Sequence, residues 1–211
     1  MQMQESTFQP NTPAPEKVPS IIGYVKEIVK FVLLALAIVI PFRIFIAQPF
    51  IVSGGSMDPT FADKQYLIVD EVSYRFEEPR RGDVIIFKAP PSALILAGMN
   101  PNSTVYYIKR IIGLPNETVR MNGDTLTIFN TEHPEGAILN EPYVVNHQGN
   151  SFEKKLESGE YFVMGDNRPW SSDSRAWGIL KRENIQGKPI VRLLPLHTFS
   201  LFPGMQTLEQ K

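Results

Sequence analysis

The feature that most constrains this chain is a long apolar run near its N-terminus. Residues 31–42 carry no charge, and the run continues apolar to Phe50 with Arg43 as its only charged residue. The uncharged core is shorter than the ~20 residues that cross a bilayer. Lys30 and Arg43 extend the usable span, because long basic side chains can reach the two lipid interfaces. We therefore expect residues 21–49 to form one transmembrane helix that anchors the chain in a lipid bilayer.

A cleavable signal peptide is the competing interpretation, since a short apolar core is also typical of one. Cleavage requires small residues at the first and third positions before the cut. After Ala47 that pattern fails, because Phe45 occupies the third position and Pro49 follows closely. An uncleaved anchor is the favoured interpretation.

The residues around the apolar run predict its orientation. Residues 1–20 are polar and rich in proline, which is typical of a flexible tail. Lys17, Lys26 and Lys30 precede the apolar core, whereas Arg43 stands alone at its far end. Basic residues favour the cytoplasmic side. We expect a cytoplasmic N-terminus and a domain of residues 50–211 on the outer side of the membrane.

Residues 50–211 alternate short apolar runs with turn residues, which is the pattern of strands. No convincing amphipathic helix stands out. We expect a mainly β domain, sandwich- or barrel-like, in which the more polar residues 116–160 form a smaller β sub-lobe. The clearest predicted strands are Tyr66–Val69, Asp83–Phe87, Val105–Ile112, Thr125–Phe129, Tyr161–Met164 and Ile190–Leu194.

Composition excludes several kinds of chemistry. The net charge is -1 and no basic stripe is present, so nothing favours nucleic acid as a partner. The chain has no cysteine, which excludes disulfides and thiolate nucleophiles. Its three histidines, His133, His147 and His197, lie far apart without metal-ligand spacing. We expect no metal, no cofactor and no histidine-based triad.

A first candidate cluster spans residues 53–60, Ser-Gly-Gly-Ser-Met-Asp-Pro-Thr. Gly54 and Gly55 allow a sharp turn with exposed N–H groups. In such a turn Ser56 can present its hydroxyl to a substrate while nearby N–H groups stabilise an oxyanion. A plain linker after a membrane span is the alternative.

A second cluster, residues 105–113, contains a lysine in a predicted strand. Lys109 then shares a face with Tyr107 and Ile111. Burial there lowers a lysine pKa from ~10.4 by up to 3–5 units, and the neutral amine is a competent general base. An edge-strand lysine whose amine reaches water is an equal alternative.

A third cluster, residues 165–178, is dense in hydrogen-bonding groups. Asp173 and Arg175 are placed to pair, and Ser171 to orient a nearby amine. A calcium loop is disfavoured, because Arg168 falls where a ligand oxygen is needed. The two tryptophans make a plain surface loop the weaker alternative.

Together and in this order, these clusters resemble the motifs of the type I signal peptidase family. Residues 81–87, Arg-Gly-Asp-Val-Ile-Ile-Phe, resemble the family's structural strand, and the resemblance covers residues 50–194 and the anchor. It implies a membrane-bound serine endopeptidase that cuts signal peptides from exported preproteins after Ala-X-Ala. It leaves open contacts with the secretion machinery, and whether the membrane is the plasma or the thylakoid membrane.

The resemblance also implies a role for each matching residue. Ser56 would be the nucleophile, with its N–H as one oxyanion donor, and Lys109 would be the general base. Ser171 would hydrogen-bond the lysine amine. The supporting ion pairs would be Asp173 with Arg175 and Asp166 with Arg110, and the substrate pockets would be lined by Phe50, Val52, Gly54, Met57, Tyr107 and Ile108.

One position departs from some family members, which carry a serine oxyanion donor where this chain has Gly54. The second donor is therefore unidentified. Two other functions stay open. A soluble Ser–Lys autoprotease of the repressor type is disfavoured by the anchor and by the lack of a DNA-binding segment. A membrane-tethered β domain that binds peptides without cutting them is the remaining alternative.

Overall fold

The computed structural model describes residues 21–45, 47–206 and 208. The predicted tail, residues 1–20, lies outside the described residues. The chain divides into two compact units, residues 1–41 and 42–211.

The N-terminal unit contains most of helix α1 (Ile21–Phe45), which has 25 residues. Large apolar side chains along α1 are exposed, among them Ile28 at 62%, Leu34 at 59% and Ile38 at 64%. Within the described residues we find no helix that is both long and apolar enough to cross a bilayer. The transmembrane helix expected from the sequence is therefore not confirmed by the structure.

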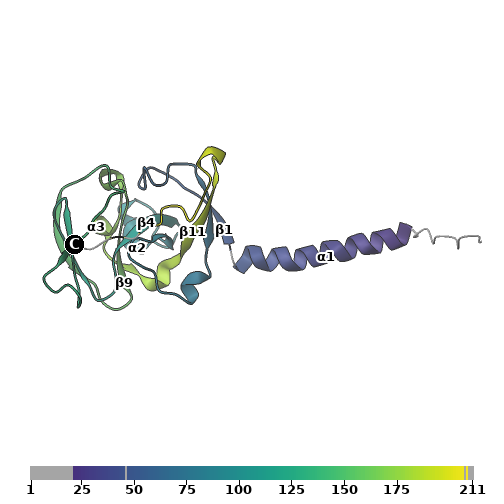
Figure 1. Cartoon of the computed structure of the whole chain (residues 1–211), viewed down its shortest axis with the longest axis horizontal. Coiled ribbons are helices and arrows are strands. Elements are labelled where there is room, and N and C mark those ends of the chain that lie inside the picture. The colour runs from purple at the N-terminus through teal and green to yellow at the C-terminus, as the bar shows by residue number, and fades with distance from the viewer. Residues whose placement is uncertain (1–20, 46, 207, 209–211) are drawn as a thin grey trace, which may run out of the picture. The chain divides into compact units, whose positions relative to one another are not determined.

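The second unit is mainly β, as predicted for this domain (Figure 1). Its larger sheet is antiparallel throughout and carries the predicted active-site strands. In spatial order its strands are β1 (Ala47–Ile51), β2 (Tyr66–Asp70), β11 (Ile185–Leu194), β3 (Val84–Lys88), β4 (Tyr106–Gly113), β9 (Glu160–Met164) and β10 (Leu180–Lys181), with β12 (Ser200–Leu201) beside β11.

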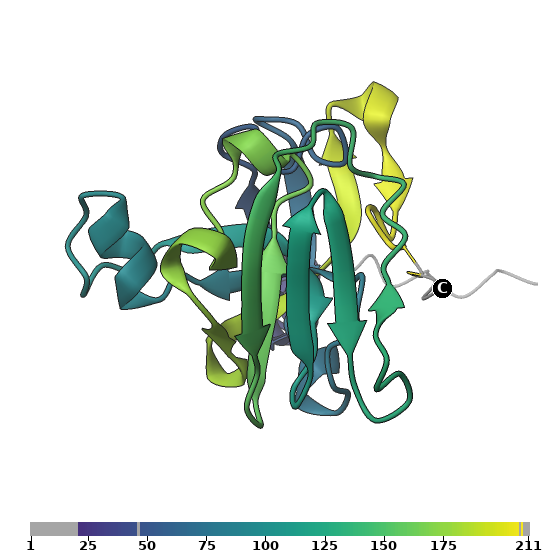
Figure 2. The same ribbon diagram turned by 90° about the vertical axis from the view of Figure 1, so that its left-hand side faces the viewer.

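The smaller sheet is built within the residues where the sequence predicts a sub-lobe, and Figure 2 shows it face on. Its buried side chains come from alternate strand positions, such as Val119 and Met121 on the central strand. These pack with Leu126 and Ile128 into a core cluster that also includes Phe162 of the larger sheet. Its strands in spatial order are β7 (Ala137–Ile138), β6 (Thr125–Phe129), β5 (Thr118–Gly123) and β8 (Asn150–Lys155).

Helices of the second unit are too short to show an amphipathic repeat, so the sequence pattern did not reveal them. The two α-helices are α2 (Pro91–Leu96) and α3 (Ser174–Trp177). Asp173 caps α3 by accepting a hydrogen bond from the Arg175 backbone. The short 3-10 helices are η1 (Ser73–Arg75), η2 (Arg168–Trp170), η3 (Arg182–Asn184) and η4 (Leu196–Thr198).

Candidate active site

The predicted nucleophile lies in a turn that follows strand β1. Hydrogen bonds from Val52 N to Gln65 O and from Lys64 N to Val52 O, each 2.9 Å, hold the ends of this turn together. Gly54 adopts φ +86°, a conformation that suits glycine. A side chain at Gly55 would lie 2.7 Å from the Asp58 carboxylate. The two glycines therefore permit the turn that carries Ser56.

Met57 does not line the substrate pocket, which corrects the expectation from the sequence. Its side chain is fully buried and packs with Phe61, Leu67 and Val84 in a core cluster. The turn directs Met57 inward while Ser56 stays partly exposed. Met57 thus holds the nucleophile turn on the sheet.

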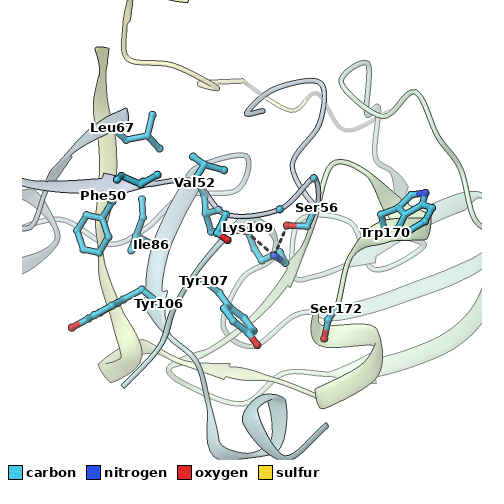
Figure 3. A pocket seen from close by; sticks show the side chains of 15 residues that line it. Phe50, Val52, Ser56, Leu67, Ile86, Tyr106, Tyr107, Lys109, Trp170 and Ser172 are labelled. Carbon is cyan, nitrogen blue, oxygen red and sulfur yellow. Dashed lines mark hydrogen bonds between the residues drawn. The ribbon is translucent and has the colours of Figure 1, made fainter. Parts of the chain in front are cut away.

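Lys109 lies in the middle of β4 and its side chain reaches the nucleophile. Its Nζ donates to Ser56 Oγ at 2.8 Å and to Ile108 O at 2.9 Å, as Figure 3 shows. Only 4% of the residue is exposed, so the edge-strand alternative with an amine in water does not hold. The structure brings together the two residues that the sequence places 53 positions apart.

Burial changes the acid–base behaviour of this amine. Desolvation lowers the pKa of Lys109 from 10.5 to about 8, against a smaller opposing effect of the Asp173 and Asp166 carboxylates. A charged amine in an apolar site lacks the solvation that water gives it, so the neutral form is favoured. A fraction of about one in ten molecules then carries a neutral Lys109 at pH 7.

A residue that the sequence analysis missed holds the nucleophile turn from outside. Asn167 donates its backbone N–H to Ser56 O at 3.1 Å and its side-chain amide to Gly55 O at 3.0 Å. It is the last residue of the run Gly165–Asp166–Asn167, which opens the third candidate cluster of residues 165–178, and that position was the only signal available in the sequence. Asn167 therefore fixes two successive carbonyl groups beside the nucleophile.

The predicted pair of Asp173 and Arg175 is present. Asp173 is fully buried and accepts from Arg175 Nε and Nη2, both at 2.8 Å. Its Oδ2 also accepts from Gly165 N at 3.1 Å. Asp173 therefore holds the two ends of the 165–175 loop together, and its carboxylate acts on the charge of Lys109.

The predicted pair of Arg110 and Asp166 is also present, and both side chains are fully buried. Two parallel hydrogen bonds of 2.9 and 2.7 Å join them. Asp166 further accepts from Thr60 Oγ1 at 2.5 Å, so the pair is bonded to the nucleophile turn. Arg110 Cζ lies 4.0 Å from the centre of the Tyr143 ring, which belongs to the sub-lobe residues.

The bond predicted from Ser171 to the Lys109 amine is not found. Ser171 Oγ is buried but has no hydrogen-bond partner among the described residues. A side chain on Gly165 would lie 2.2 Å from that oxygen, so Ser171 packs against the backbone of Gly165. The Lys109 amine is oriented by Ser56 and the Ile108 carbonyl.

A pocket of about 300 Å³ opens beside the Ser56 hydroxyl. Phe50, Val52, Gly54, Tyr107 and Ile108 line it, as expected from the sequence. Three lining residues that were missed lie beside predicted ones: Leu67 pairs with Phe50, Ile86 pairs with Ile108, and the Tyr106 ring contacts Phe50. Pairing between distant strands cannot be read from one sequence.

Fold and site together define a class of protein: a mainly β hydrolase in which a buried lysine contacts a serine beside an apolar pocket. Comparison with known proteins also indicates a hydrolase of this kind. The family model described as "Signal peptidase, peptidase S26" matches residues 25–194.

Three relatives show the extent of the similarity. "Signal peptidase I" of Leptolyngbya laminosa is 36% identical, over 92% of this chain and 90% of that protein. "Probable signal peptidase I-1" of Synechocystis is 35% identical, over 84% and 87%. A crystal structure of a signal peptidase I from Enterococcus faecalis is 32% identical, covering 53% of this chain and 97% of that one, with a TM-score of 0.41. The chain belongs to the signal peptidase family, peptidase S26, and is a serine endopeptidase.

Proposed function

We propose that this protein removes signal peptides from exported preproteins, with Ser56 as nucleophile and Lys109 as general base. The observation that carries the proposal is the 2.8 Å contact between Ser56 Oγ and the buried Nζ of Lys109. Neither a histidine nor a metal is needed, because a neutral lysine amine can accept the serine proton.

The proposed reaction begins when neutral Lys109 accepts the Ser56 hydroxyl proton as Oγ attacks the scissile carbonyl. The Ser56 N–H stabilises the oxyanion that forms on the carbonyl oxygen. The C–N bond then breaks, and the Lys109 ammonium returns its proton to the departing amine. Water, deprotonated by Lys109, hydrolyses the acyl-enzyme in a second round of the same steps.

An open strand edge supports the proposed mode of substrate binding. Residues Tyr106–Ile108 of β4 pair with β3 on one side, whereas the pairing of β4 with β9 begins only at Arg110. An extended peptide can add along the other edge of residues 106–108, directly beside Lys109. The adjoining apolar pocket lies where it can take the small apolar side chains that precede an Ala-X-Ala cut.

The test of this proposal is the pH dependence of cleavage. For a preprotein whose signal ends in Ala-X-Ala, kcat/KM should rise with pH through about 8, because Lys109 must lose its proton to act. We expect roughly a tenth of the plateau rate at pH 7 and a hundredth at pH 6. Ser56→Ala should show no cleavage at any pH. A plateau already reached at pH 7, as for a histidine base, would contradict the role of Lys109.

We also propose that residues 21–49 hold the enzyme at a bilayer, with residues 1–20 on the cytoplasmic side and residues 50–211 as the outer catalytic domain. The charge pattern of the sequence supports this orientation. So do the exposed apolar side chains of α1, because their transfer from water to lipid is favourable.

Membrane attachment is tested by changing these side chains to acids. Leu33→Asp together with Leu36→Asp should move the protein from the membrane fraction to the soluble fraction, since each Asp opposes insertion by about 3 kcal/mol. The matched control is Ile138→Asp, an equally exposed apolar residue of the sub-lobe, which should stay with the membrane. An unchanged distribution of the double variant would argue against this anchor.

A further inference from the structure

A tryptophan with no place in the proposed reaction lies at the rim of the active-site pocket. Trp170 lines the same pocket as Ser56 and Lys109, yet 79% of it is exposed. The other tryptophan of the chain, Trp177, is 7% exposed and packs in the core. Exposure of so large an apolar side chain beside a reactive group is a feature of binding surfaces.

The backbone that carries Trp170 is firmly held. Trp170 N–H donates to Asn167 O at 3.1 Å in helix η2. Arg168, which is 1% exposed, donates to both carboxylate oxygens of Glu141 and to Gly165 O. Arg175 Nη2 donates to Arg168 O at 2.7 Å. The indole therefore projects from a fixed position, so a ligand that contacts it does not have to order a loop.

The position of Trp170 indicates which part of a substrate it meets. Figure 3 shows Phe50, Val52, Ile86 and Tyr106 on one side of Ser56 and Trp170 on the other. The apolar side is assigned above to the small residues before the cut. An extended chain that passes the Ser56 hydroxyl then continues toward Trp170 with the residues that follow the cut.

We propose that Trp170 is a specificity-determining residue that contacts one of the first residues after the scissile bond, on the mature side of the preprotein. This inference rests on the proposed cleavage reaction. An indole face offers apolar area at small entropic cost, so it favours large aliphatic or aromatic side chains over glycine. The contact is made by the part of the substrate that leaves with the amine, so it acts on formation of the acyl-enzyme.

The experiment uses the full-length enzyme in detergent and peptides that end their signal in Ala-X-Ala. A reference peptide carries glycine at the first three positions after the cut, and three others carry leucine at one of these positions. The measured quantity is the ratio of kcat/KM for each leucine peptide to that of the glycine peptide. We expect wild type to prefer leucine at one position, and Trp170→Ala to reduce that ratio about 5- to 20-fold.

Two further variants serve as controls for the effect of Trp170→Ala on the kcat/KM ratio. Trp170→Phe should retain most of the preference, because an aromatic face remains. Phe76→Ala removes an aromatic side chain that is 84% exposed and does not line the pocket, and it should leave the ratio unchanged.

The possible outcomes separate this inference from the proposed function. If the wild-type enzyme cuts no peptide after the second alanine, the proposed cleavage reaction fails. If it cuts them all but Trp170→Ala keeps the leucine preference, this inference alone fails. The inference is also overturned if Trp170→Ala slows every peptide by one factor, because the indole would then not distinguish the residues that follow the cut.

Discussion

Replacing Lys109 by methionine is expected to abolish cleavage and yet to make the folded protein more stable at pH 7. Loss of the general base should lower kcat by at least about 10³-fold. The fall of the Lys109 pKa from 10.5 to about 8 corresponds to about 3 kcal/mol of unfavourable burial of the charged amine. Methionine has no charge to desolvate and a similar length. Because Ser56 and Ile108 each lose a hydrogen-bond donor, we expect a net gain of about 1–2 kcal/mol in the free energy of unfolding.

The pH dependence of this gain has a definite sign. Between pH 8 and 10.5 the unfolded chain keeps the Lys109 proton that the folded chain has lost, so wild-type stability rises with pH relative to the variant. The advantage of Lys109→Met should be full below pH 8 and should turn into a small disadvantage above pH 10.5, where the burial penalty is gone and only the lost hydrogen bonds remain.

Denaturant unfolding of both proteins at pH 7 and at pH 10 measures this gain. Ser56→Ala is the matched control, because it removes activity but leaves Lys109 buried, and its stability should follow the wild-type pH dependence. A Lys109→Met variant that is less stable than wild type at pH 7 would show that the penalty for burying the amine is smaller than the free energy of its two hydrogen bonds.

The largest loss of stability is expected from Asp166→Ala. Arg110 is 0% exposed and would keep its charge in an apolar interior without a counter-ion. Removing one partner of a buried pair typically lowers the free energy of unfolding by about 3–5 kcal/mol. Thr60 also loses its acceptor, so the nucleophile turn loosens and kcat should fall in the fraction that stays folded.

Thermal unfolding of three variants distinguishes an unpaired charge from a simple loss of contacts. The double variant Arg110→Met/Asp166→Leu leaves no charge behind and should recover most of the stability lost in Asp166→Ala. Arg120→Ala breaks an exposed pair with Glu153 and should lower stability by less than about 1 kcal/mol. If Asp166→Ala lowers the stability no more than Arg120→Ala does, the buried pair contributes little to stability.

The sequence predicted which residues gather at the site better than it predicted their surroundings. Ser56 and Lys109 were singled out by short motifs, and the resemblance of these motifs to a known family implies their roles. The burial that lowers the Lys109 pKa depends on strands from several parts of the chain, and no local pattern reports it. For the same reason Met57 was assigned to the pocket although it packs in the core, and Ser171 was assigned a bond to Lys109 that the structure lacks.

Strands were predictable where apolar residues are frequent. The predicted β2, β3, β4, β6 and β9 agree with the structure within one or two residues. The sub-lobe strands β5 and β8 were not predicted, because they bury few side chains and most of their positions are polar. Their pairing depends on backbone hydrogen bonds between residues about 30 positions apart.

Asn167 has a consequence for the direction in which the nucleophile turn presents its backbone. A trans peptide unit is planar, with its C=O and N–H pointing in opposite directions. The Gly55 carbonyl and the Ser56 N–H belong to the same peptide unit. By holding the carbonyl, Asn167 therefore also sets the direction of the N–H, which points the opposite way within the peptide plane. A side chain that does not touch the substrate thus aims the proposed oxyanion donor, and the rigidity of one amide bond transmits its effect.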